Sequence, residues 1–463
     1  MIMNDAGNSI GDEFIAGELK YKVLTQNGNT GTVVLICGTD YYDEWDDCEI
    51  VIIIPDFVEY ESVSYNVIKI GEGAFAYYGG LAGVIIPDSV ISIEKEAFYC
   101  CEDLKSVTIG KGVTSIEEKA FRGCKSLTDI IIPDNVTYIG GCAFMRCTSL
   151  ESVTIPDSVP FIGGWTFAGC ENLKSITIGK GVTSIGYGAF GGCINLTSIL
   201  VSVTNSNYSS IDGVLFNKDQ TKLIQYPSGK ELDTYIIPDC VTSVGDSAFN
   251  NCGCLGSVII HGSVTSIEDR AFSGCFGLTS ISVSLSNPKY SSMDGVLFNK
   301  DQTKLIQYPA EKKLITYRIP DKVTSIGNSA FVFCEILKDI IIPDSVSFIE
   351  NNAFARCSSL ENITIPDSVT FIGDDAFSNC ENLKSVTIGK GVTSIGSEAF
   401  GICLSLTSVY YKGDVPSAKN VYKDTPNTLI SYYPKENSSW ENKIKNGKWQ
   451  NRRTIAWDPD TEG

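Results

Sequence analysis

Cysteine is the residue type in this sequence whose number and spacing point most directly to chemistry. The chain holds 17 cysteines, and eleven of them stand three residues after a phenylalanine. Repeated cysteines can form disulfides, hold zinc, carry out redox chemistry or fill a repeated position of a buried core. The eleven are Cys101, Cys124, Cys147, Cys170, Cys193, Cys252, Cys275, Cys334, Cys357, Cys380 and Cys403.

The even spacing of these cysteines favours a core position. Each has equivalent cysteines before and after it in the series, so none has a unique disulfide partner. Structural zinc usually takes cysteines from C-x-x-C pairs, and the sequence has no such pair. Free cysteine is small, weakly polar and often buried, so we predict a cysteine ladder in a repeated core. Outside the series, Cys37 and Cys48 could form a disulfide if the protein is exported.

Histidine and carboxylate residues show little sign of catalysis. His261 is the only histidine, and it stands at a predicted strand end where other repeats have proline or glycine. We expect a solvated turn residue there, and one histidine excludes a multi-histidine metal site. The aspartates that follow proline recur along the chain, which favours hydrogen bonds that stabilise turns over an acid–base pair. We therefore predict no enzymatic activity, no cofactor and no metal site.

A period of 23 residues reveals the elements that must position the cysteines. One period, residues 150–172, reads LESVTIPDSVPFIGGWTFAGCEN. In it, Val153 and Ile155 alternate with hydroxyl residues, which predicts a short half-buried strand that Pro156 ends. We expect the phenylalanine and cysteine to follow in a compact helical or 3₁₀ turn. Such a unit cannot bury its apolar face alone, so the period predicts a solenoid of stacked parallel strands.

Two segments interrupt this period, at about 204–238 and 286–320. Each contains the sequence DGVLFNKDQTKLIQYP and lies in a gap of 59 residues between successive phenylalanines of the series. We interpret them as longer, degenerate repeats in which Phe216 and Phe298 keep the phenylalanine position. LIQYP is expected to replace a strand and to be followed by an extra strand. The residues expected at the cysteine position are Asp219 and Asp301.

The recurring units, such as IPDSVTFIGDDAFSNCENLKSVTIG at 365–389, resemble the leucine-rich repeats of the Treponema pallidum type, also called BspA-like repeats. The resemblance covers about residues 66–411. It implies a curved, right-handed leucine-rich-repeat solenoid and a place among surface proteins that bind host proteins or other microbes. We expect the flanking residues 1–65 and 412–463 to form an N-terminal β cap and a C-terminal cap.

The solvent side of the first strand in each repeat is the candidate binding face. Hydroxyl residues predominate there, and aliphatic, aromatic and acidic residues interrupt them. An extended, mildly polar face with exposed aliphatic residues suits protein binding. The alternative is that threonine and isoleucine are simply good strand residues. The candidate binding residues are Asp129, Ile131, Thr154, Thr177, Leu200, Ile259, Asp339, Ile341 and Tyr410.

Charge and hydropathy restrict the classes of partner. The formal net charge of −19 disfavours nucleic-acid binding, and no apolar run approaches the roughly 20 residues of a transmembrane helix. The acidic, polar N-terminus does not look like a secretory signal. The family resemblance implies a surface or secreted protein, and a cytoplasmic location stays open.

We therefore expect a recognition or adhesion protein that binds another protein on a host cell, a neighbouring cell or the extracellular matrix. Two alternatives remain. The chain could be an internal scaffold or spacer without a specific ligand, which its internal block duplication favours. It could also bind carbohydrate through the C-terminal segment, which contains Trp440, Trp449 and Trp457.

Overall fold

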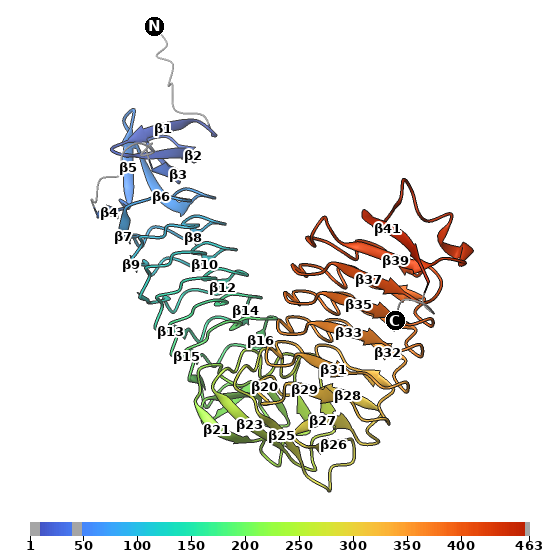
Figure 1. Cartoon of the computed structure of the whole chain (residues 1–463). Helices are drawn as coiled ribbons and strands as arrows, with labels where there is room; N and C mark the ends of the chain where they lie inside the picture. The colour runs from blue at the N-terminus through green and yellow to red at the C-terminus, as the bar shows by residue number, and fades with distance from the viewer. Residues whose placement is uncertain (1–9, 39–48, 459–463) are drawn as a thin grey trace. The chain divides into compact units, whose positions relative to one another are not determined.

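The computed structural model describes residues 10–38 and 49–458 and divides into two compact units, Met1–Lys230 and Glu231–Gly463 (Figure 1). Both units consist of short strands stacked in ladders, which confirms the predicted leucine-rich-repeat solenoid. Each turn of the solenoid contributes a first strand, a second strand and a connecting turn. No described helix is long and apolar enough to cross a membrane. The predicted division at residues 65 and 411 stays a prediction.

In the first unit, the first strands form one parallel ladder and the second strands form another, joined to an N-terminal antiparallel meander. The first strands are β4 (Ile50–Ile53), β7 (Leu81–Ile85), β9 (Ser106–Thr108), β11 (Asp129–Ile130), β13 (Ser152–Ile155), β15 (Ser175–Ile178) and β17 (Ser198–Val201). The second strands are β6 (Val63–Ile70), β8 (Ser92–Ile93), β10 (Ser115–Ile116), β12 (Tyr138–Ile139), β14 (Phe161–Ile162) and β16 (Ser184–Ile185). The remaining strands are β1 (Glu13–Ala16), β2 (Leu19–Asn27), β3 (Thr30–Gly38), β5 (Phe57–Tyr60), β18 (Tyr208–Ile211) and β19 (Val214–Asn217), with β20 (Lys222–Gln225) as the second strand of the first hairpin segment.

The second unit repeats this plan and ends in a cap. Its first strands are β21 (Leu232–Ile236), β23 (Leu255–Ile260), β25 (Ser280–Val283), β29 (Thr316–Arg318), β31 (Asp339–Ile341), β33 (Asn362–Ile365), β35 (Ser385–Ile388), β37 (Ser408–Tyr411), β39 (Ile430–Pro434) and β41 (Arg452–Trp457). Its second strands are β22 (Ser243–Val244), β24 (Ser266–Ile267), β28 (Lys304–Gln307), β30 (Ser325–Ile326), β32 (Phe348–Ile349), β34 (Phe371–Ile372), β36 (Ser394–Ile395) and β38 (Ser417–Ala418). The others are β26 (Tyr290–Met293), β27 (Val296–Asn299), β40 (Lys448–Trp449) and the 3₁₀ helix η1 (Ser438–Trp440).

The ladders are in register, so each residue lies beside the residue one period away. Val153 pairs with Ile176 and Thr154 with Thr177 between β13 and β15. Because successive strand residues point to opposite faces, valines and isoleucines stack inward while hydroxyl residues stack outward. The phenylalanine of each turn stacks on its neighbours, as Phe144 does with ring centroids 5.5 Å from Phe121. The core is therefore a set of parallel columns of like residues.

The turn after each second strand differs from the predicted helical or 3₁₀ turn. The residues two before and two after the phenylalanine have positive φ, as Glu96 (57°) and Cys100 (54°) have around Phe98. Left-handed residues at these positions prevent a helix. Every second backbone N–H group of the turn instead donates to a carbonyl of the next turn of the solenoid. The Phe98 N–H, for example, donates to the Ala120 carbonyl at 2.7 Å. Among the described residues, η1 is the only helix.

The two long repeats contain antiparallel hairpins, and this corrects the predicted register. Phe298 lies within β27 of the β26–β27–β28 meander, and Phe216 lies in β19 of the equivalent meander. The phenylalanine position of the turn belongs to Tyr308, whose N–H donates to Ala330 at 2.8 Å and whose ring stacks on Phe331 at 5.1 Å. LIQYP thus supplies the second strand of a turn and the start of the connecting turn after it. The antiparallel strands that precede it are an insertion into the regular repeat.

An Asp-Gly pair explains why a hairpin forms in each of these segments. Asp294 (φ 50°) and Gly295 (φ 78°) connect β26 to β27, and Asp212 (48°) and Gly213 (78°) connect β18 to β19. Two successive residues with positive φ define the type I′ turn, for which Asp-Gly is a preferred sequence.

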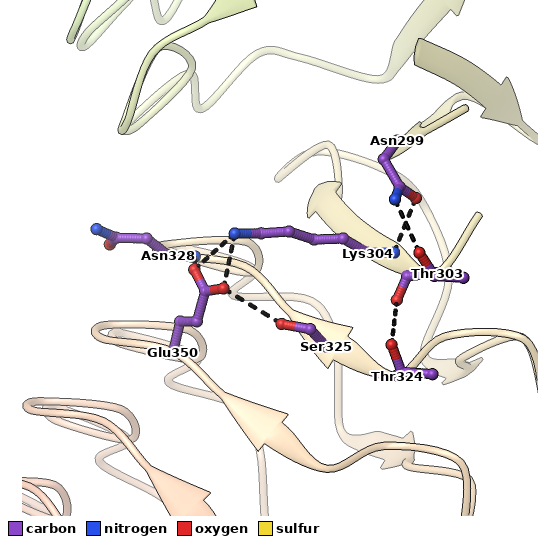
Figure 2. Close-up of polar contacts among 7 residues, drawn as sticks. All are labelled: Asn299, Thr303, Lys304, Thr324, Ser325, Asn328 and Glu350. Atoms are coloured by element: carbon purple, nitrogen blue, oxygen red, sulfur yellow. Dashed lines mark hydrogen bonds and ion pairs between the residues drawn. The ribbon is translucent and has the colours of Figure 1, made fainter. Parts of the chain in front are cut away.

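A polar cluster ties the second hairpin to the regular turns that follow it (Figure 2). Lys304 Nζ lies 2.6 and 2.9 Å from the two carboxylate oxygens of Glu350, which belongs to the second turn onward. The same carboxylate accepts hydrogen bonds from Ser325 Oγ at 3.2 Å and from the Asn328 N–H at 2.9 Å. Asn299 holds the start of β28 by accepting the Lys304 N–H at 2.8 Å. Three donors therefore make four hydrogen bonds to one carboxylate where the irregular segment meets the repeats.

The C-terminal cap encloses its tryptophans, so the rings that the carbohydrate alternative would use are buried. Trp440, Trp449 and Trp457 are 0%, 6% and 8% exposed. Trp440 packs against Tyr411 at 4.9 Å and against Trp449 at 5.2 Å between ring centroids. The rings are buried because they cover the apolar end of the last described turns.

Candidate protein-binding face

The cysteine ladder lies in the core. All eleven thiols of the series are buried, and the fifteen cysteines whose side chains the structure describes are all free. Nine of the thiols donate to the phenylalanine carbonyl of the preceding turn, as Cys124 does to Phe98 at 3.2 Å and Cys147 to Phe121 at 3.2 Å. The described residues contain no group of three or more histidine, cysteine or acidic side chains placed for a metal ion.

Burial also makes the ladder thiols chemically inert. It raises the pKa of Cys101 and Cys403 to about 12 and holds the pKa of Cys147 well above its ordinary value. Because the thiolate is the reactive form, these groups are poor nucleophiles. Cys240 and Cys254, outside the series, are exposed. The predicted Cys37–Cys48 disulfide lies outside the described part of the chain, because Cys48 and the side chain of Cys37 are not described.

The other candidate chemical groups have structural partners. His261 Nδ1 lies 3.2 Å from an oxygen of Asp239, a turn aspartate, and its side chain is 36% exposed. Turn aspartates bridge successive turns of the solenoid, because Asp88 accepts the Lys111 N–H at 2.7 Å and two equivalent aspartates do the same. The predicted role of these aspartates in turns therefore extends to the neighbouring repeat.

In the first unit, the structure brings five predicted binding residues into one surface, which we call the unit-1 patch. It consists of Asp129, Ile131, Thr154, Thr177 and Leu200. Thr154 pairs with Thr177, and Thr177 pairs with Leu200, on three successive first strands. Ile131 and Leu200 are 76% and 48% exposed. The Asp129 carboxylate has no ion pair or hydrogen bond within the described residues.

The four predicted residues of the second unit do not form one surface. Ile259 on β23 is only partly exposed. Tyr410 on β37 is also partly buried, because it stacks on Tyr432 with centroids 4.7 Å apart and packs against Trp457 at 5.0 Å. Asp339 and Ile341 on β31 lie together and are exposed. Tyr410 therefore belongs to the closure of the solenoid.

Asp339 and Ile341 line a shallow groove of about 830 Å³ over β31 and β33, which we call the unit-2 groove. Ile341 is 44% exposed. The Asp339 and Asp344 carboxylates have no ion pair or hydrogen bond within the described residues. The complete lining is Thr316, Asp339, Ile340, Ile341, Ile342, Asp344, Asn362, Ile363, Thr364, Ile365, Pro366, Asp367, Ser368 and Lys412.

Sequence reasoning missed parts of both surfaces. Ile53 and Ile85 are 67% and 40% exposed and continue the column of outward first-strand residues toward the N-terminus. The first-strand alternation would have identified them, since each stands two residues after an outward position. Lys412, which follows β37, also lines the unit-2 groove, and the same alternation would have identified it, because it stands two residues after Tyr410.

The arrangement of these faces suits binding. In the unit-1 patch, Thr154, Thr177 and Leu200 stand on strands that pair with one another residue by residue, so their positions are held in advance.

Comparison with known proteins places this chain in a family. Residues 58–159, 142–231, 228–311 and 307–425 match the model of the BspA type leucine rich repeat region, with six copies. No match was found among curated proteins.

Several solved structures are similar to this chain. The pneumococcal vaccine antigen PcpA is 23% identical, with 97% of this chain and 100% of that chain covered and a TM-score of 0.49. A leucine rich cell surface protein from Faecalibacterium prausnitzii A2-165 is 29% identical, with 87% and 95% covered and a TM-score of 0.49. The T. pallidum leucine rich repeat protein is 28% identical, with 41% and 81% covered and a TM-score of 0.35. Since the family model spans most of its length, this chain belongs to the BspA-type leucine-rich repeat family.

Proposed function

We propose that this chain is a non-catalytic recognition protein that binds another protein through the unit-1 patch. We further propose that it acts at a cell surface or in the secreted state, as the family resemblance implies. Members of the family are typically non-catalytic repeat scaffolds, and the thiols of the cysteine ladder described above are buried. The expected partner is a protein of a host cell, a neighbouring cell or the extracellular matrix.

The observation that carries this proposal is the exposure of Ile131. Its side chain is 76% exposed at the end of a strand whose neighbours present hydroxyl groups. Fully burying an isoleucine side chain in an interface is favourable by about 1.5–3 kcal/mol. Leu200, 48% exposed, offers a second apolar contact three strands away. At the usual strand spacing the patch extends over about 14 Å.

The unit-1 patch has the composition of an interface centre with a polar surround. Ile131 and Leu200 supply apolar contacts, Thr154 and Thr177 supply hydroxyl groups between them, and Asp129 adds an unpaired charge. Protein interfaces combine an apolar centre with a polar rim in this way. An internal spacer needs no exposed aliphatic residues on a hydroxyl face, and this is why we prefer recognition to the scaffold alternative.

The proposal is tested by binding of the full chain to an array of extracellular-matrix proteins and glycans. We expect saturable binding to at least one protein, weakened by about tenfold or more in an Ile131→Lys/Leu200→Lys variant. Ile91→Lys is the matched control, because Ile91 is 48% exposed but lies beside the second-strand ladder. Equal binding by the patch variant and the wild type would refute the patch. Binding to glycans alone would refute a protein partner.

A further inference from the structure

The loop that follows β25 presents a leucine entirely to solvent. Leu285 is 99% exposed, the highest value among the large hydrophobic residues of the described chain. It stands in a turn closed by a hydrogen bond from the Asn287 N–H to the Ser284 carbonyl at 2.9 Å. Covering an exposed aliphatic side chain in an ordered turn with a partner is favourable, because it removes apolar surface from water.

The loop is rigid in spite of its exposed tip. The Asn287 side chain is fully buried and donates to the carbonyls of His261 at 2.7 Å and Val264 at 2.9 Å. Its oxygen accepts the N–H groups of Lys289 and Tyr290 at 2.9 and 2.8 Å. Binding through this loop would therefore lose little conformational entropy.

Comparison with the first hairpin segment shows that an aliphatic tip is retained while its surroundings change. The equivalent residue, 82 positions earlier, is Val203, which is 91% exposed. The sequences VSVTNSNYSS and VSLSNPKYSS differ at four positions in ten, whereas the hairpins after them are identical over DGVLFNKDQTKLIQYP. Both tips are aliphatic, but only the second loop has a lysine, Lys289, in this stretch.

The Leu285 loop is basic. Lys289 stands four residues after the leucine, and the Lys300 ammonium donates to the carbonyl of Leu285 itself at 3.2 Å and to that of Asn287 at 2.6 Å. Residues 280–293 contain no carboxylate. The loop thus combines one free aliphatic side chain with two neighbouring positive charges.

The unit-2 groove has the complementary character. Its lining contains the partly exposed Ile341 and three aspartates, Asp339, Asp344 and Asp367, against one lysine, Lys412. Asp339 and Asp344 have no partner among the described residues. The groove volume of about 830 Å³ is large enough for a leucine and a lysine side chain together. Since Leu285 is 99% exposed, it does not occupy the groove of its own chain.

We infer that the Leu285 loop of one chain docks into the unit-2 groove of a second copy of this chain. Leu285 would cover Ile341, and Lys289 and Lys300 would lie opposite Asp339 and Asp344. The two surfaces differ, so the contact is heterologous, and repeating it links molecules head to tail. Complementary charges on the two surfaces orient the contact. This self-association is independent of the unit-1 patch.

The experiment is sedimentation velocity of the full-length chain over a concentration series at about 0.15 M salt, which screens the repulsion between two acidic molecules. We expect wild-type association that grows with concentration. Leu285→Ser and Asp339→Asn/Asp344→Asn should each weaken it at least tenfold. Val203→Ser is the matched control for the loop. Glu335→Gln/Glu381→Gln is the control for charge, because both glutamates are exposed and lie outside the groove.

A mixture of the two weakened variants gives the sharpest outcome. Leu285→Ser keeps its groove and Asp339→Asn/Asp344→Asn keeps its loop, so the mixture should form dimers and nothing larger. A wild-type chain that stays monomeric at every concentration would overturn the inference. So would equal weakening by either control variant, or a mixture that does not associate. Circular dichroism of each variant shows that it is folded.

Discussion

The regular turns and the two hairpin-bearing segments stabilise themselves with different residues. A regular turn is held by its neighbours: its phenylalanine stacks on the next phenylalanine, and its thiol donates to a carbonyl one turn earlier. A hairpin segment has no such thiol and is held by polar side chains instead. In the second segment, buried Asn287 donates to two carbonyls of the preceding turn and accepts two N–H groups of its own loop, and Lys304 pairs with Glu350.

This difference explains where the molecule can vary. A turn whose contacts are identical above and below can be copied without disturbing its neighbours, and the block at 127–144 indeed returns at 337–354. A loop that a buried asparagine ties to the preceding turn can carry an exposed tip such as Leu285 without losing order. The regular turns therefore supply length, and the hairpin segments supply distinctive surface.

The largest expected effect is a pH dependence of stability that comes from the regular turns, because only they contain the ladder thiols. Burial raises the pKa of nine ladder thiols above the ordinary value of 9.0, so the unfolded chain loses these protons first. Their contribution to stability is complete below pH 9 and is lost as the pH rises through 9 toward 12. Each thiol contributes about 1.4 kcal/mol per pH unit in that window. We expect denaturant titrations followed by circular dichroism to show a steep loss of stability above pH 9.

A variant with two fewer thiols checks this assignment. Cys147→Ala/Cys170→Ala should lose stability with a slope shallower by about 2.7 kcal/mol per pH unit than that of the wild type. An unchanged slope would show that the ladder thiols are not the groups responsible.

A substitution inside a regular turn should have the next largest effect. Phe144→Ala removes a buried ring that stacks on Phe121 and Phe167 at 5.5 and 5.4 Å. We expect a loss of about 3–5 kcal/mol in the free energy of unfolding, from lost burial and the cavity left behind. Phe161→Ala, where the ring is 40% exposed, should cost less than about 1 kcal/mol. Similar losses for the two would contradict the stacked core.

The hairpin segment should depend on its buried asparagine. Asn287→Ala leaves two carbonyls and two N–H groups without their partner, and we expect a loss of about 3 kcal/mol. Hydrogen exchange should also accelerate first in residues 284–290. The exposed Asn382→Ala is the control and should change stability by less than about 0.5 kcal/mol. Unchanged exchange in the loop would argue against its rigidity.

The smallest effect compares two acidic residues. Glu350→Ala removes the acceptor of three donors at the junction in Figure 2, and we expect a loss of about 1–2 kcal/mol. Glu151→Ala removes an exposed pair with Lys174 in a regular turn and should cost about 0–0.5 kcal/mol. Thermal and chemical denaturation of both variants would measure the difference, and equal losses would remove any special role of the junction.

The period, the buried columns and the family could all be predicted from sequence, because strand alternation and a 23-residue repeat act through local geometry. The Asp294-Gly295 pair is a sequence signal for a hairpin. The prediction nevertheless aligned Phe298 with the phenylalanine of the regular repeat, and this register is wrong because Tyr308 holds that position. The positive φ values that replace a helix had no clear signal, since residues as different as Glu96 and Cys100 adopt them.

The sequence by itself determined that equivalent turns of this chain stack on one another, because a repeat with one apolar face must cover that face with the next repeat. Only the tertiary structure decided which outward residues become a surface. Tyr410 is partly covered by Trp457, which is distant in sequence. The cap tryptophans are buried by such distant neighbours too, as Trp440 is against Tyr411. Asp339 and Ile341 line a groove because β33 and Lys412 lie beside them. Exposure depends on what packs alongside a residue, and the repeat pattern is the same whether that neighbour is solvent or another turn.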